Sequence, residues 1–148
     1  MHAVDVNVLI YAYDPAFPHH PAARSALEGA LAAESLALFP GVIASFVRLT
    51  TDRRVFSEPA SPDTALGFID ALVARDRTHI IDPGARFWPT LRHLVRRYDL
   101  RGADISDASL AAAAIALRLT WVSFDRGFAR FRELSWIDPA GDPEADIR

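Results

Sequence analysis

The 148-residue chain contains no cysteine, which excludes a disulfide framework, a cysteine-ligated zinc site and a thiol nucleophile. It also contains no lysine, because all 16 basic residues are arginine. A Walker-type phosphate lysine and a Schiff base are therefore excluded. No apolar run approaches the roughly 18 residues of a membrane span, and the first 13 residues lack the positive start of a signal peptide. We expect a cytoplasmic protein without membrane association.

Glutamate is scarce as well. Only 5 of the 19 acidic residues are glutamate, and the other 14 are aspartate. The net charge is −3, so the chain is not a polycation that coats nucleic acid, and any nucleic-acid contact must be local. The 51% hydrophobic and 24% charged content is typical of one globular domain of this length.

Apolar runs of strand length alternate with helix-like stretches along the whole chain. The pattern predicts strands over 3–13 (continuing into a turn or short helix), 35–39, 78–81, 120–124 and 134–137. It predicts helices over 21–33, 42–51, 62–75, 87–98 and 106–119, and one helical turn over 125–131. This alternation predicts a single α/β domain with a central, mostly parallel sheet flanked by helices. We expect this domain over 1–139 and a short polar tail over 140–148.

Seven of the 14 aspartates precede proline in turns or lie on or beside exposed helix faces, but three others do not fit their surroundings. Asp5 lies within the first apolar strand, where a buried carboxylate costs several kcal/mol unless it is paired or metal-bound. The simpler interpretation is a strand-end carboxylate that binds backbone amides around Asn7. Asp125 directly follows the predicted strand 120–124, where it could also be a turn residue or a helix cap.

The third unusual aspartate, Asp107, lies in the first turn of an alanine-rich helix. An acid there complements the helix dipole, and Ser106 or Asp104 is a natural cap for this helix. In a parallel α/β sheet, however, ligands bind outside the carboxyl ends of the strands. Asp107 lies near Asp5 and Asp125 if its helix begins at that edge of the sheet.

Three carboxylates at one edge repel one another unless a cation lies between them. Oxygen ligands without cysteine and with few histidines favour Mg²⁺ or Mn²⁺ over Zn²⁺. Such an ion polarises a phosphoryl oxygen and activates a water, which is the chemistry of phosphodiester hydrolysis without a covalent nucleophile. The sequence therefore predicts a metal site of Asp5, Asp107 and Asp125.

Four segments carry a resemblance to a known family: VDVNVLIYAY at 4–13, SFVRLTTDRRVF at 45–56, RGADISDASLAAAAIA at 101–116 and VSFDRGFARFRELSWIDP at 122–139. In this order they resemble the PIN-domain family, specifically the VapC-like toxins of bacterial toxin–antitoxin pairs. The resemblance implies a metal-dependent endoribonuclease, usually a homodimer, that a cognate antitoxin holds inactive. It carries the family's metal aspartates over to Asp5, Asp107 and Asp125.

The sequence departs from the family at one position. Many PIN domains carry a further acid, commonly glutamate, in the helix after the second strand, where this chain has Ile43, Ala44 and Ser45. Asp104, three residues before Asp107, either supplies a further ligand or only caps the helix. The alternative function is therefore a weakened PIN-like module that binds RNA or a protein without cleavage. A response-regulator-like domain is disfavoured because it requires a lysine.

For the mechanism, we expect Asp5 and Asp107 to hold the ion, and Asp125 to ligate it or orient the attacking water. Asn7 and Ser123 are expected to form hydrogen bonds within the site.

The arginines raise a separate question, because much of the arginine excess reflects replacement of lysine on solvated faces. One cluster begins directly after Asp125, and a guanidinium binds phosphate in a bidentate manner. We therefore predict that Arg126 and Arg130 bind the RNA substrate.

Overall fold

The computed structural model describes residues 1–141, in which five short strands form one parallel sheet in the order β3-β2-β1-β4-β5. The strands are β1 (His2–Val4), β2 (Leu36–Leu38), β3 (Thr78–Ile80), β4 (Thr120–Val122) and β5 (Trp136–Ile137). The helices are α1 (Val6–Tyr13), α2 (His20–Ala33), α3 (Pro40–Thr50), α4 (Pro62–Val73), α5 (Phe87–Arg97), α6 (Asp104–Ala116) and the 3₁₀ helix η1 (Arg126–Arg130). The predicted α/β class with a parallel sheet is confirmed. The division at residue 139 stays a prediction, because residues 142–148 of the expected tail lie outside the described part.

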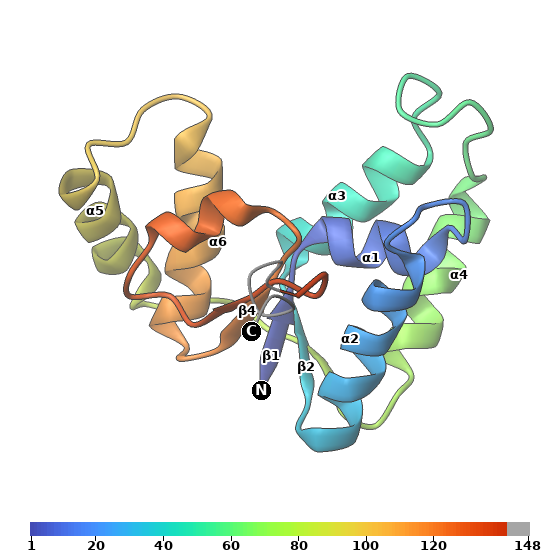
Figure 1. Ribbon diagram of the computed structural model, residues 1–148, viewed down its shortest axis with the longest axis horizontal. Helices are drawn as coiled ribbons and strands as arrows, with labels where there is room; N and C mark the ends of the chain where they lie inside the picture. Colours follow the sequence, from blue (N-terminus) through green and yellow to red (C-terminus); the bar gives the residue numbers. More distant parts are fainter. Residues whose placement is uncertain (142–148) are drawn as a thin grey trace, which may run out of the picture.

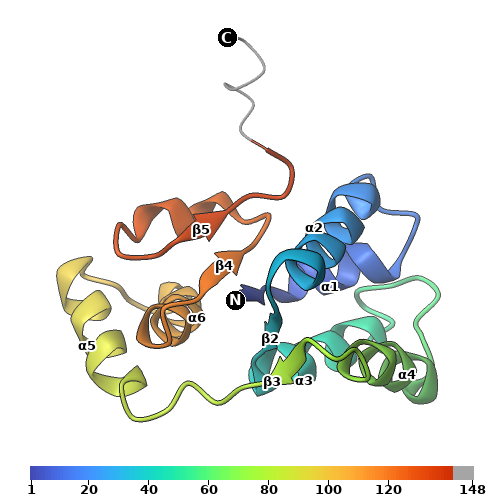
Figure 2. The ribbon, with the colours of Figure 1, turned by 90° about the horizontal axis from the view of Figure 1, so that it is seen from below.

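The helices cover both faces of the sheet. Figures 1 and 2 show α5 and α6 on one side of it and α1 to α4 on the other. Helix α6 lies close against the sheet because its inner side chains are small: Ala108, Ala111, Ala112, Ala113, Ala114 and Ala116 are all buried. Helix α5 packs against α6 from outside and buries Leu94 completely. Within residues 1–141, no helix has the length and apolar character needed to cross a membrane.

The short helix η1 is held to the sheet by aromatic packing. Trp121 of β4 is fully buried, and its ring lies 5.6 Å from the ring of Phe128 in η1, between centroids. Phe131, at the end of η1, is also buried. Two such anchors fix a segment that is too short to be stable by itself. The residues at its ends, Asp125 and Arg130, are positioned as a consequence.

Several predicted boundaries differ from those in the structure by two residues or more. Within 3–13 the strand already ends at Val4, and the turn or short helix expected after it is α1, which begins where Asp5 accepts a hydrogen bond from the Val6 amide. The strand predicted over 120–124 ends at Val122. Neither Ser106 nor Asp104 caps the alanine-rich helix, which begins at Asp104 after a cap residue without a side-chain hydrogen bond.

The topology determines which residues meet at the edge of the sheet. The chain builds β1, β2 and β3 outward and then returns to place β4 beside β1, so the strand order reverses between these two strands. In parallel α/β folds this switch point is where ligands bind. Helix α6 runs back between parallel strands, so its first turn, with Asp104 and Asp107, lies at the carboxyl edge.

Candidate functional site

Asp5 is the buried acid around which the candidate site is arranged. It directly follows β1, and Ser123 directly follows β4; because Val4 and Val122 are register partners, the two side chains meet. Asp5 is 7% exposed and Ser123 is fully buried. The Ser123 hydroxyl donates to Oδ2 of Asp5 at 2.6 Å, and the Val6 amide donates to Oδ1 at 2.7 Å. These two donors offset the cost of removing the carboxylate from water.

The Ser123 hydroxyl is used fully, as one donor and two acceptors. It accepts from Nδ2 of Asn7 at 3.1 Å and from the Asp125 amide at 3.0 Å. Asn7 Nδ2 also lies 3.3 Å from Oδ2 of Asp5, and Asn7 Oδ1 accepts from the Phe124 amide at 3.3 Å. The structure thus brings both residues expected to assist the site, Asn7 and Ser123, into direct contact with Asp5.

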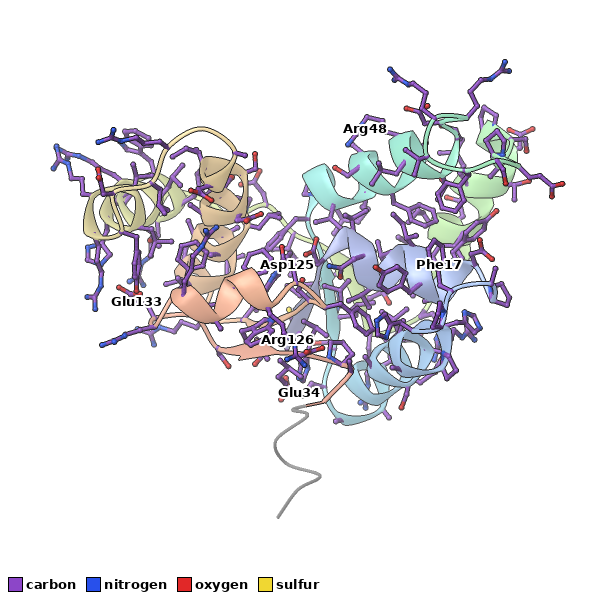
Figure 3. All side chains as sticks on the ribbon, turned by 45° about the horizontal axis from the view of Figure 1, so that its top comes forward. Phe17, Glu34, Arg48, Asp125, Arg126 and Glu133 are labelled. Carbon is purple, nitrogen blue, oxygen red and sulfur yellow. The ribbon has the colours of Figure 1, made fainter. Side chains whose placement is uncertain are left out.

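Asp125 lies at the start of η1 and is labelled near the middle of the molecule in Figure 3. Its Oδ1 accepts from the Gly127 amide at 2.8 Å, so it caps η1 as well as facing the other acids. A Cβ at residue 127 would lie 3.0 Å from that same oxygen, which explains a glycine there. Oδ2 of Asp125 has no hydrogen-bond partner within residues 1–141 and can accept a water or a ligand.

Asp107 and Asp104 share one guanidinium. Nη2 of Arg130 donates to Oδ2 of Asp107 at 2.9 Å, and Nη1 donates to Oδ1 of Asp104 at 3.0 Å. The Arg130 guanidinium also lies over the ring of Phe131, 4.9 Å from its centroid. Its Nε is buried and has no partner among the described residues. Arg130 is therefore held across the first turn of α6 rather than extended into solvent.

The electrostatics show that the three carboxylates lie near one another. Burial raises the pKa of Asp5, the bonds from Ser123 and Val6 oppose that rise, and the negative charges of Asp125 and Asp107 add to it. Burial also raises the pKa of Asp107, with a further rise from the charge of Asp125, while Arg130 opposes it. The site therefore has an excess of negative charge that its single arginine does not remove.

The donors fit a cation that keeps much of its water. Among residues 1–141, no group of three or more histidine, aspartate or glutamate side chains is arranged so that it could hold a metal ion by itself. Protein donors already engage both oxygens of Asp5, and Arg130 engages one oxygen of Asp107. Mg²⁺ commonly binds through one or two carboxylates plus waters and substrate phosphate. The carboxylate oxygens, which repel one another, suit such a hydrated ion. They do not suit an ion whose ligands are all protein atoms.

The structure separates the two arginines predicted to bind RNA. Arg126 pairs through Nε with Oδ2 of Asp138 at 3.2 Å, so it ties η1 to the segment after β5. Only Arg130 contacts the acids. Sequence reasoning missed this bridging role because 23 and 26 residues separate Arg130 from its two partners, Asp107 and Asp104, and no local pattern links them.

The helix after the second strand, α3, contains no acid. It begins directly after β2, at the same edge of the sheet as the acids. The departure noted at Ile43, Ala44 and Ser45 is therefore a real difference in the donor set. The Asp104 carboxylate binds Arg130 and is half-exposed, and its role as a further ligand stays a prediction.

The chain is similar to known proteins over nearly its whole length. The family model described as PIN domain matches residues 3–134. The chain is 46% identical over 140 residues to the VapC ribonuclease Mb2897 of Mycobacterium bovis, covering 94% of this chain and 95% of that one. It is 38% identical to ribonuclease VapC25 of Mycobacterium tuberculosis, covering 94% and 99%. The fold is similar to that in VapBC2 of Rickettsia felis bound to a promoter DNA fragment, with a TM-score of 0.68, 21% identity and coverage of 92% and 96%.

Replacing Ser123 by alanine should destabilise the protein. The variant leaves the buried Asp5 carboxylate without its shortest hydrogen bond, at an expected cost of about 1–3 kcal/mol in the free energy of unfolding. Urea unfolding at neutral pH in EDTA measures this. The control Ser57→Ala, at an exposed loop position, should change the value by no more than about 0.5 kcal/mol. Equal stability of the two variants would contradict the role of Ser123.

The raised pKa of Asp5 also makes a pH-dependent prediction. Between its ordinary value of 3.8 and its raised value, folded Asp5 keeps a proton that the unfolded chain has lost, so stability falls as pH rises through this window. Asp5→Asn does not titrate. Its unfolding free energy minus that of the original chain should therefore increase from about pH 4 to pH 7 in EDTA. A flat or decreasing difference in urea titrations would show that Asp5 is not destabilised by its charge.

Proposed function

The chain belongs to the PIN-domain family, and on this premise we propose that it is an endoribonuclease dependent on Mg²⁺ or Mn²⁺ that acts as the toxin of a toxin–antitoxin pair. The observation that supports the proposal is that Asp5 follows β1 at the switch point beside β4, and that the charges of Asp107 and Asp125 raise its pKa. Relatives similar over nearly the whole chain are named VapC ribonucleases, which supports RNA as the substrate. The reaction is hydrolysis of a phosphodiester bond.

Asp5 and Asp107 would hold the ion, and Asp125 would either ligate it or orient the attacking water. When bound, the ion would supply charge stabilisation at a phosphoryl oxygen and lower the pKa of a bound water. Ser123 and Asn7 keep the Asp5 carboxylate in one orientation, because both donate to its Oδ2. Oδ2 of Asp125 is open to accept a hydrogen from the water that attacks.

Arg130 would change partners during the reaction. In the structure its guanidinium binds Oδ2 of Asp107, one of the two oxygens through which this carboxylate would hold a cation. A cation that binds Asp107 therefore competes with Arg130, and a displaced guanidinium beside the site can bind a phosphate oxygen. This keeps the expected role of Arg130 in RNA binding. For Arg126, the same role requires release from Asp138.

The proposal extends to the partners of the chain. We expect a cognate antitoxin protein, a homodimer and a location in the cytoplasm, where RNA is available. The fold is similar to that in the solved VapBC2 complex bound to promoter DNA, which supports an antitoxin partner. A small reading frame next to the gene, whose product copurifies with this chain and inhibits it, would support the assignment.

A second candidate is a PIN-like module that binds RNA or a protein partner without cleaving RNA. The observation that favours it is the donor set: α3 contains no acid, and the described residues form no complete metal cage. The two candidates share the fold and differ in whether the bound RNA is cut.

Removal of the acids should separate the two candidates. Asp5→Asn, Asp107→Asn and Asp125→Asn should each lower the rate of RNA cleavage by about 100-fold or more, since several kcal/mol of charge stabilisation depend on the ion. Asp63→Asn, on the exposed start of α4, is the control and should leave the rate unchanged. The assay is cleavage of labelled RNA by the purified, antitoxin-free protein with Mn²⁺.

EDTA should abolish that cleavage, and added Mg²⁺ or Mn²⁺ should restore it. Full activity in EDTA or in Asp5→Asn would refute the mechanism. RNA binding without cleavage by the original chain, with metal present, would favour the second candidate.

Arg130→Met should tighten metal binding while it weakens RNA binding. The substitution frees Asp107 and removes a partly exposed ion pair of about 1 kcal/mol, so the affinity for Mn²⁺ should rise about fivefold. Titration calorimetry with Mn²⁺ measures this without reference to cleavage. Arg132→Met, at an exposed arginine on the same segment, should leave the Mn²⁺ affinity unchanged. Weaker Mn²⁺ binding by Arg130→Met would show that Arg130 supports the ion rather than competes with it.

A further inference from the structure

Helix α5 and the turn before it form the strongest concentration of positive charge in the chain. Residues 83–98 contain four arginines, at 86, 92, 96 and 97, together with His93, and no acidic residue. This segment has a formal charge of +4 in a chain whose net charge is −3. The acidic site does not use any of these residues. The charge is therefore a separate property of the surface.

Three side chains on α5 form one exposed line. Trp88, Arg92 and Arg96 are spaced four residues apart, so they lie on the same side of the helix, about 6 Å apart along its axis. All three are exposed, and Trp88 is 64% exposed although a tryptophan there would be expected in a core or an interface. The opposite side of α5, with Leu94, packs on α6. The three side chains therefore face solvent. We call Trp88, Arg92 and Arg96 the α5 stripe.

The arginines of the stripe are free to bind a ligand. The neighbouring row is neutralised by Glu133, which pairs with His93 at 3.1 Å and with Arg97 at 3.3 Å. Figure 3 labels Glu133 on the side of the molecule occupied by α5 and α6. Within residues 1–141, neither Arg92 nor Arg96 makes an ion pair. A hollow of about 510 Å³ lies beside them, lined by Pro89, Arg92, His93, Arg96 and Arg97.

The stripe is connected to the acidic site by a short segment. Only six residues separate Arg97, at the end of α5, from Asp104, at the start of α6. Their Cα atoms are therefore at most about 25 Å apart. Arg101, which is exposed, lies on this connection. A strand of RNA whose scissile phosphate lies at the acids can follow the connection to α5.

We propose that the α5 stripe is a docking site for the phosphate backbone of single-stranded RNA, outside the acidic site. Guanidinium groups bind phosphates in a bidentate manner, and an exposed indole provides a surface on which a base stacks. An arginine line with an aromatic at one end is the arrangement by which proteins hold single strands without reading sequence. That this RNA is the substrate rests on the proposed function. The binding itself does not depend on cleavage.

The experiment measures the affinity for a short single-stranded RNA that is 2′-O-methylated and so cannot be cleaved. Fluorescence anisotropy is recorded over a range of salt concentrations for the original chain and for Arg92→Gln/Arg96→Gln. The matched control is Arg24→Gln/Arg53→Gln, which removes the same charge from two other exposed positions. Loss of two phosphate contacts should reduce the salt slope by about 1.4 and weaken binding roughly 10- to 30-fold near 0.1 M salt. Trp88→Ala should weaken binding several-fold with the slope unchanged, because stacking releases no counterions.

Equal affinity and slope in the stripe variant and the control would overturn the proposal. It would also be overturned if the stripe variant kept its RNA affinity but lost binding to polyglutamate, or changed its mass in light scattering; these results would assign the stripe to an acidic protein or to a second copy of the chain. Failure of the original chain to cleave ordinary RNA, with stripe-dependent binding intact, would refute the proposed nuclease and leave the docking site standing.

Discussion

The structure depends on the burial of one carboxylate, that of Asp5. An ionised acid with 7% exposure is costly, and the donors that offset this cost come from two places far apart in the chain: Val6 and Asn7 beside it, and Ser123 after β4. The Ser123 hydroxyl reaches Asp5 only when β1 and β4 are neighbours in the register that pairs Val4 with Val122. A slip of one residue would turn Ser123 to the other face of the sheet and leave the carboxylate unsatisfied. The register of β1 and β4 therefore also determines the geometry of the site.

The other acids destabilise the folded state further, because their negative charges repel that of Asp5. Asp107 and Asp125 raise the pKa of Asp5 by their charge, and Arg130 compensates only part of this excess. A protein selected for stability alone would replace one of these aspartates by asparagine. Sites that carry out chemistry commonly retain such destabilising groups, and the surrounding core supplies the missing stability. Here that core includes Trp121 and Phe128, which fix η1 to the sheet.

Much of the fold could be predicted from the sequence, because alternating apolar runs and alanine-rich periodicity are local signals. The three aspartates could be identified too, since a carboxylate among valines or directly after an apolar strand is conspicuous. The end of β1 could not, because the following helix is apolar on most of its surface and its residues fit a buried strand equally well. The pairing of Arg130 with Asp104 and Asp107 depends on how α6 and η1 pack. The spacing of residues in the sequence does not predict this packing. The separate environments of Arg126 and Arg130, four residues apart, have the same origin.

The hydrogen bond between Ser123 and Asp5 joins residues 118 positions apart. During translation, the ribosome adds Ser123 about 6–24 s after Asp5 at the usual rate of 5–20 residues per second. Until then the nascent chain has Asp5 without its partner strand, and Asp125 and Arg130 do not yet exist. The acidic site consequently assembles only when nearly all of the described chain has been made. An order of synthesis that places the central strand β4 late thus leaves a growing chain without a complete acidic site until its last segments are made.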